Sequence, residues 1–177
     1  LQVAGAWLAA AERFPARAAD FAANAARIAV PKVAENPDGF EAVFIAARAY
    51  HKLASLKPDA EGAEAYAKAE EFYLRAAGIQ PDNYNHLFAA AVCADAAGRS
   101  AEAERHYRLL LDRMSGEDLF TAAIRNNLAG VISRTSPSRP RLEEALTLAD
   151  AAIQHEPVAA FYGTRGWILL ALGRPED

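Results

Sequence analysis

Cysteine is nearly absent from this chain of 177 residues, because Cys93 is the only one. A single thiol excludes an internal disulfide framework, and its neighbours Ala89–Val92 predict that it is a small buried apolar side chain. The histidines never occur at the HExxH or HxH spacing of metal sites; they are His51, His86, His106 and His155. The sequence therefore predicts no metal site and no cofactor.

The chain also lacks long apolar runs and the short motifs of catalysis. No run reaches the roughly 18 apolar residues of a membrane span, and GxGxxG, GxxxxGK[ST] and GxSxG do not occur. The acid pairs Glu70-Glu71 and Glu143-Glu144 are expected on a solvated helix face, not in a pocket that shifts a pKa for acid–base catalysis. We therefore expect no membrane span, no catalytic residue and no enzymatic activity of this segment.

An excess of positive charge is missing as well. Lys and Arg number 19 against 23 Asp and Glu, which gives a net charge of −4. A nucleic-acid binder needs a basic stripe that displaces counterions, so this class is not expected. The one basic stretch, Arg134–Arg141, is expected to be a solvated loop. The compartment stays open, with the cytoplasm slightly favoured.

Alanine and other apolar residues are what the chain has in abundance. Hydrophobic residues make up 53% of it, and runs of β-branched residues are absent. This composition favours an all-α protein, built as one globular domain or as a short solenoid.

The stretch Pro81–Leu111 reads as two antiparallel helices. Asp82 and Asn83 can cap the first helix, Gly98 can end it in the left-handed conformation, and Ser100 can cap the second. Apolar residues at helical spacing predict the buried faces; they are Leu87, Ala90, Ala91, Ala94, Ala103, Tyr107, Leu110 and Leu111. Glu104 and Arg108 form an i,i+4 ion pair on the solvated side.

Alanines where the two helices cross, and Tyr107 four residues after the small Ala103, resemble the tetratricopeptide repeat (TPR). The resemblance covers residues 37–177. It implies an all-α, right-handed α-solenoid of antiparallel helix pairs, that is, a TPR-like superhelix. The implied units are 37–81, 82–117, 118–157 and a truncated repeat 158–177, preceded by N-terminal helices at 1–36 that form a divergent or partial repeat.

Several departures from a regular array are expected. Pro37 and Pro81 lie 44 positions apart, against 34 in a standard repeat, so about ten residues are inserted, and we place them in the turn between the helices. Pro31 should interrupt or kink the helix before it. Ser115 stands where a closing proline is usual. Tyr162, Gly166 and Leu169 are expected to point inward in the last helix, and Gly173 is expected to end it. The chain ends suggest a piece of a larger protein.

The resemblance also implies a concave groove lined by the first helix of each pair. The residues expected in this partner-binding groove are Phe44, Arg48, His51, Asn85, Phe88, Val92, Asp95, Asn126, Asn127, Gly130 and Trp167, with Ser133 and Thr164 beside them. The family's lysine–asparagine clamp for a C-terminal carboxylate is only faintly represented, by Arg48 and Asn127. Chaperone-tail binding is therefore not predicted.

These observations predict a protein–protein interaction module that binds a peptide or partner surface in the groove. Two alternatives stay open. One is a regulatory or sensory segment of a larger enzyme, such as a kinase or protease. The other is a self-assembly scaffold that associates through the apolar end of the last helix, Ile168–Leu172.

Overall fold

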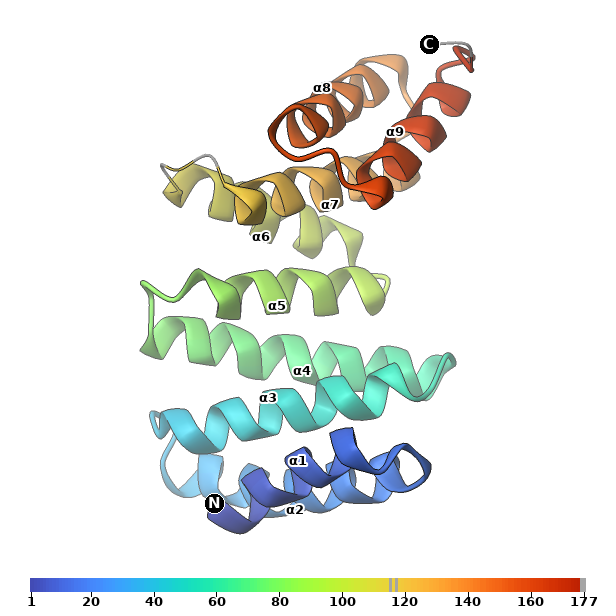
Figure 1. Cartoon of the computed structure of the whole chain (residues 1–177). Coiled ribbons are helices and arrows are strands. Elements are labelled where there is room, and N and C mark those ends of the chain that lie inside the picture. Colours follow the sequence, from blue (N-terminus) through green and yellow to red (C-terminus); the bar gives the residue numbers. More distant parts are fainter. Residues whose placement is uncertain (115, 117, 176–177) are drawn as a thin grey trace. The chain divides into compact units, whose positions relative to one another are not determined.

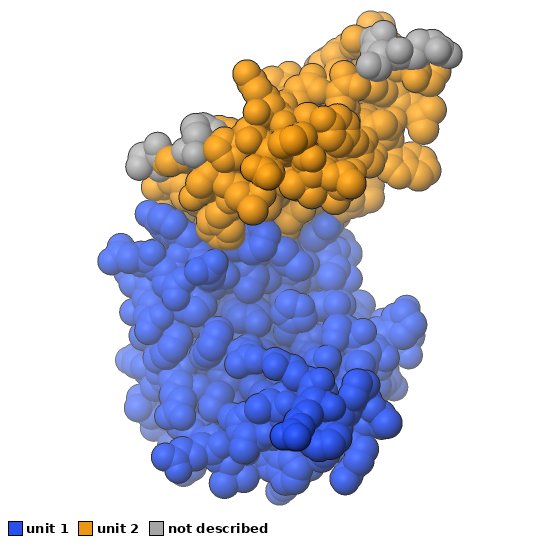
Figure 2. Space-filling view, viewed as in Figure 1, with its two compact units in different colours: residues 1–99 blue, residues 100–177 orange. Residues whose placement is uncertain are grey.

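The computed structural model describes residues 1–114, 116 and 118–175, and all regular structure among them is helical (Figure 1). The predicted all-α class is therefore confirmed for this part of the chain. Ser115 and the predicted boundary at residue 117 lie outside the described residues. In the described part, no helix is both long and apolar enough to cross a bilayer. The chain divides into two compact units, residues 1–99 and 100–177, coloured separately in Figure 2.

Unit 1 contains five α-helices that pack in the order of the chain. They are α1 (Gln2–Arg13), α2 (Ala18–Glu35), α3 (Phe40–Ser55), α4 (Ala60–Ile79) and α5 (Tyr84–Ala96), with a short 3-10 turn at Pro15–Arg17. Each helix packs against the next one, and α1 also contacts α3. Helices α1 and α3 therefore lie side by side in this unit.

Small residues form much of the unit 1 core. Helical spacing in the sequence predicts inward residues on α3, α4 and α5, and most of them are buried: Val43, Ala46, Ala47, Ala69, Tyr73, Ala76, Leu87, Ala90, Ala91 and Ala94. Tyr50 and Ala77, predicted inward by the same spacing, are half-buried. Alanine at these positions lets neighbouring helix axes approach closely, because the interaxial distance depends on the side chains at the contact. Cys93 is buried too, as its apolar neighbours predicted.

Two expectations about unit 1 are wrong. Helix α2 is not interrupted at Pro31 but continues to Glu35. A proline removes a single backbone donor, and Ala29 and Val33, which are buried on either side of it, hold both parts of the helix on the core.

The residues inserted between Pro37 and Pro81 also do not lie mainly in a turn. Only Leu56–Asp59 separates α3 from α4, so most of the extra length belongs to the helices. Asp59 caps α4 by accepting a hydrogen bond from the Gly62 N–H at 3.1 Å. A Cβ on Gly62 would lie 1.8 Å from the Lys57 carbonyl oxygen, so the backbone approach requires glycine here.

The predicted glycine stops are confirmed. Gly98 has φ +75° after α5, and Gly173 has φ +72° after α9. In both cases the glycine N–H and the following N–H bond back to the helix, as the Schellman motif requires. The Arg99 N–H donates to the Ala94 oxygen at 2.8 Å, and the Arg174 N–H donates to the Leu169 oxygen at 2.9 Å.

Unit 2 contains α6 (Ser100–Arg113), α7 (Leu119–Thr135), α8 (Arg139–His155) and α9 (Ala159–Ala171). Each of these helices packs on the next, and α7 also contacts α9. Helical spacing in the sequence predicts inward residues on α7 and α8, and most of them are buried: Leu128, Ala129, Ile132, Ala145, Ala149 and Ala152. Ile153, predicted inward by the same spacing, is half-buried. The expected basic loop is short, since only residues 136–138 separate α7 from α8, and Arg139 and Arg141 belong to the first turn of α8.

Helix α9 is rotated relative to expectation. Leu169 is buried as predicted, together with Phe161 and Ile168, but Tyr162 is 52% exposed. Phe161 packs with Ala122 of α7 and Ala152 of α8, so the neighbouring position Tyr162 points away from both helices. Trp167, 74% exposed, and Leu170, 59% exposed, lie on this outward face as well. The apolar end of α9 is thus part core and part surface.

Candidate functional site

A pocket of about 220 Å³ lies in unit 1 between α1, α3 and α4, and we call it the α1–α3 pocket. It brings together the predicted groove residues Arg48 and His51. The remaining lining residues are Leu8 and Glu12 of α1, Lys52 and Ser55 of α3, and Tyr73 of α4. The lining is predominantly polar and carries two cationic side chains against one carboxylate.

Arg48 is held from two sides. Its Nη2 donates to Glu12 Oε1 at 2.8 Å, which joins α3 to α1 across 36 positions of sequence. Its guanidinium carbon lies 5.9 Å from the centre of the Phe44 ring, a cation–π distance. Both partners of the Arg48–Glu12 pair are exposed, so the pair contributes little to stability and mainly orients the guanidinium.

His51 lies at the inner end of this group. Its Nδ1 is 3.5 Å from the Tyr73 hydroxyl and 3.8 Å from Cys93 Sγ. Burial raises the pKa of Tyr73 and of Cys93 to about 12, so both groups keep their hydrogen at neutral pH. Each of the two groups can therefore donate to Nδ1 of His51 when the ring carries its hydrogen on Nε2.

The charge state of His51 follows from the same surroundings. Burial, and then the nearby charge of Lys52, lower the pKa of His51. The ring is therefore neutral at pH 7. It acts in the pocket as a neutral polar group rather than as a cation.

Phe44, another predicted groove residue, packs inside unit 1. Its ring centre lies 5.5 Å from Phe40, 5.2 Å from His86 and 6.4 Å from Tyr73. These rings come from α3, α4 and α5. Such aromatic contacts each add about 0.5–1.5 kcal/mol beyond buried area, so Phe44 has a structural task in addition to any contact with a partner.

The predicted residues of α5 are more dispersed. Asn85 lies in the first turn, is exposed, and donates through Nδ2 to Asn83 Oδ1 at 3.1 Å. Asn83 also caps α5, as expected. Phe88, Val92 and Asp95 are half-buried further along the helix. None of the four lines the α1–α3 pocket.

In unit 2 the predicted residues divide into two places. Asn127 of α7 donates to the Tyr107 hydroxyl of α6 at 3.4 Å, and Asn126 donates to Asn127 Oδ1 at 3.5 Å. At Gly130 an added Cβ would lie 3.1 Å from the Arg134 guanidinium. Trp167 lies on the outward face of α9. A separate hollow of about 560 Å³ beside α8, lined by Arg125 and His155 among others, contains no predicted residue.

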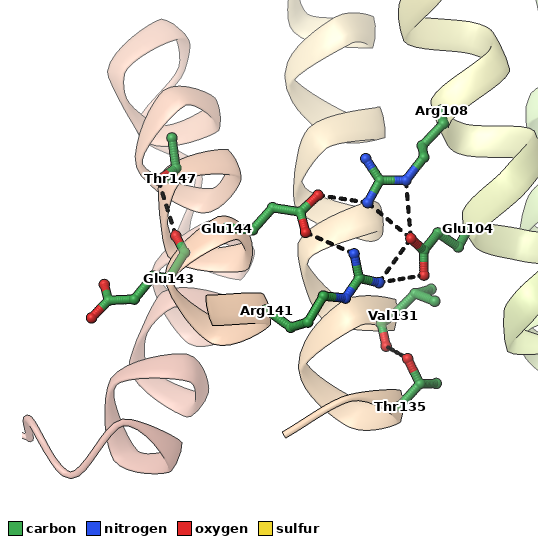
Figure 3. A network of polar contacts seen from close by, with 8 residues as sticks. All are labelled: Glu104, Arg108, Val131, Thr135, Arg141, Glu143, Glu144 and Thr147. Carbon is green, nitrogen blue, oxygen red and sulfur yellow. Dashed lines mark hydrogen bonds and ion pairs between the residues drawn. The ribbon is translucent and has the colours of Figure 1, made fainter. Parts of the chain in front are cut away.

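Four charged side chains join α6 to α8 in unit 2 (Figure 3). Arg108 donates to Glu104 at 2.8 Å and to Glu144 at 2.5 Å, and Arg141 donates to Glu104 at 2.7 Å and to Glu144 at 2.7 Å. Burial alone would raise the pKa of Glu104, but hydrogen bonds from Arg141 and Arg108 and their charges outweigh it and lower that pKa. The predicted Glu104–Arg108 pair is thus confirmed as part of a larger network that holds the two helices together.

Metal ligands do not cluster in the described part of the chain: no three His, Cys, Asp or Glu side chains there lie close enough to hold an ion.

Sequence reasoning missed most of the α1–α3 pocket. Glu12 and Leu8 precede the residues that resemble a repeat, and Lys52 and Ser55 lie beyond the expected groove positions on α3. The signal that could have found Glu12 is its place on the last turn of α1, one turn after the predicted inward residue Leu8. That signal needs the α1–α3 contact, which the sequence does not specify.

The chain was also compared with known proteins. No protein-family model matches it, and no curated protein matches it.

Proposed function

We propose that this chain is a TPR-like helical-repeat module that binds a peptide segment of a protein partner. In such modules the first helices of successive pairs lie side by side and leave one face for a ligand. The observation that supports this proposal is the packing of α1 beside α3 and of α7 beside α9, with Ala47 of α3 and Ala129 of α7 buried. The right-handed superhelix is part of the proposal.

The α1–α3 pocket is the part of the proposed binding face that is best defined. It combines an oriented guanidinium, a neutral imidazole and a phenol at the edge of an aromatic cluster. Mixed polar and apolar pockets of this kind take individual side chains of an extended peptide, while its backbone meets polar groups along the face.

A selection from a phage-displayed library of random peptides tests the proposal. Enriched peptides are expected, and their affinity should fall for Arg48→Ala. The matched control is Arg27→Ala, an exposed arginine on α2 that lies outside the pocket. The proposal fails if no peptide is enriched, or if the enriched peptides bind both variants as tightly as the unchanged chain.

A further inference from the structure

The charges around the α1–α3 pocket point to one class of ligand group. Arg48 and Lys52 are cationic, Glu12 is the single acid of the lining, and the chain as a whole carries a net charge of −4. A cationic pocket on an acidic protein is a site where an anion is attracted locally and repelled elsewhere. This contrast favours an anionic group in the α1–α3 pocket.

The pocket already contains a carboxylate in hydrogen-bonding position. Glu12 Oε1 accepts from Arg48 Nη2 at 2.8 Å, although the two residues come from different helices. The Glu12 side chain is largely exposed, so it can leave this position without disturbing the core. Its carboxylate therefore marks where an outside carboxylate would bind, and it competes for the same guanidinium.

Size and neutral donors agree with this assignment. A cavity of about 220 Å³ is below the roughly 300–1,000 Å³ that small-molecule sites occupy, and it suits a single side chain. The uncharged hydroxyl groups of Tyr73 and Ser55 line the same pocket, so neutral hydrogen-bonding groups accompany its cations.

Resting on the function proposed above, we propose that the α1–α3 pocket binds an aspartate or glutamate side chain of the partner peptide through Arg48. The Glu12 carboxylate accepts the hydrogen bond from the same guanidinium until the partner's carboxylate displaces it. The group recognised is a side-chain carboxylate, not a chain end. A partner segment with an acidic residue at this contact is therefore preferred over its amide counterpart.

The test uses two capped peptides, Ac-AAEEEAA-NH2 and Ac-AAQQQAA-NH2, titrated into the 15N-labelled full chain and followed by NMR. Capping removes the terminal carboxylate, so only side chains supply acid. The glutamate peptide should bind and the glutamine peptide should bind at least about fivefold more weakly. Arg48→Gln should weaken binding of the glutamate peptide by about fivefold or more.

Glu12→Gln gives the decisive result. Removing the internal competitor should tighten binding of the glutamate peptide by about two- to fivefold. Glu35→Gln is the matched control, because this substitution removes the same charge from an exposed acid of α2. Glu35 is paired with Lys32. Its effect should stay within about twofold, since exposed charges beyond a Debye length are screened. Circular dichroism should show that each variant folds.

Several outcomes would overturn this inference. The glutamate peptide could fail to bind, or both peptides could bind equally well. Glu12→Gln and Glu35→Gln could act alike, which would show general electrostatics instead of a pocket. Inorganic phosphate could shift the pocket resonances while the peptide does not, which would assign the pocket to a free anion. If library selection still enriched peptides without acidic residues, the proposed function would stand and only the pocket assignment would fall.

Discussion

Arg99, the residue after the glycine that ends α5, donates to the carboxylate of Glu70 on α4 at 2.8 Å. Glu70 is only 2% exposed, so this pair neutralises a charge that unit 1 has buried. Unit 2 contains a corresponding contact. Arg174 follows Gly173 at the end of α9 and reaches Glu143 of α8 at 3.4 Å. In each unit the arginine after a Schellman glycine returns to a glutamate on the preceding helix.

Removing the Arg99 side chain should destabilise the protein. Arg99→Ala leaves the Glu70 carboxylate buried without this partner, and we expect a loss of about 1–3 kcal/mol in the free energy of unfolding. Glu71→Gln, one position along on the exposed side of α4, should change the free energy by less than about 0.5 kcal/mol. Urea denaturation measures both. Equal small effects would show that the Glu70 charge does not need Arg99.

Two glycines of α4 should respond in opposite directions to the same substitution. Gly62→Ala places a Cβ 1.8 Å from the Lys57 oxygen, which forces the backbone apart; we expect a cost of about 1–3 kcal/mol or more. Gly78 has open space around its Cβ position and no positive φ. Gly78→Ala should therefore be neutral or stabilise by up to about 1 kcal/mol. Thermal unfolding separates the two, and a stable Gly62→Ala protein would contradict the close approach.

The sequence predicts the features of this fold that depend on neighbouring residues. The glycine stops at Gly98 and Gly173 and the Asn83 cap need only local chemistry, and the buried faces of α3 and α5 follow from helical spacing. These features were confirmed. Within each unit, moreover, each helix packs on the next one in the chain, so the sequential spacing of the helices was informative there.

Features that depend on distant partners were predicted poorly. Glu70 was expected in solvent, but Arg99, 29 positions later, allows its burial. Glu12 entered no prediction, because its partner Arg48 lies 36 positions away. Tyr162 was expected inside, but its orientation depends on which face of α9 packs on α7 and α8. An amphipathic pattern gives the period of a helix, and the rotation of the helix follows only from its tertiary contacts.

Acid should weaken the network of Glu104, Arg108, Arg141 and Glu144. The pKa of Glu104 in the folded protein lies below its ordinary value of 4.5. The ionised Glu104 carboxylate therefore contributes its full stabilisation of the fold above pH 4.5, and this stabilisation is lost as the pH falls through the lowered pKa. Glu104→Gln should cost about 1–2 kcal/mol at pH 7, and the difference from the unchanged chain should shrink below about pH 4. Urea midpoints across this range measure it, with exposed Glu156→Gln as control. A constant difference at every pH would contradict the assignment.

His51 should titrate below its ordinary pKa of 6.5 because of burial first and the charge of Lys52 second. Two-dimensional NMR of the imidazole protons gives the midpoint directly. Lys52→Gln should raise the pKa only in part, since burial remains. A midpoint at or above 6.5 in the unchanged chain would mean that His51 is solvated instead of buried beside Tyr73 and Cys93.

Two adjacent leucines test the rotation of α9. Leu169 is 4% exposed and Leu170 is 59% exposed, so the same truncation creates a cavity at one site and removes surface at the other. Leu169→Ala should lower the free energy of unfolding by about 2–4 kcal/mol, whereas Leu170→Ala should cost less than about 1 kcal/mol. Urea denaturation at one low protein concentration compares them without any contribution from association. If Leu170→Ala proved as costly as Leu169→Ala under these conditions, the described orientation of α9 would be wrong.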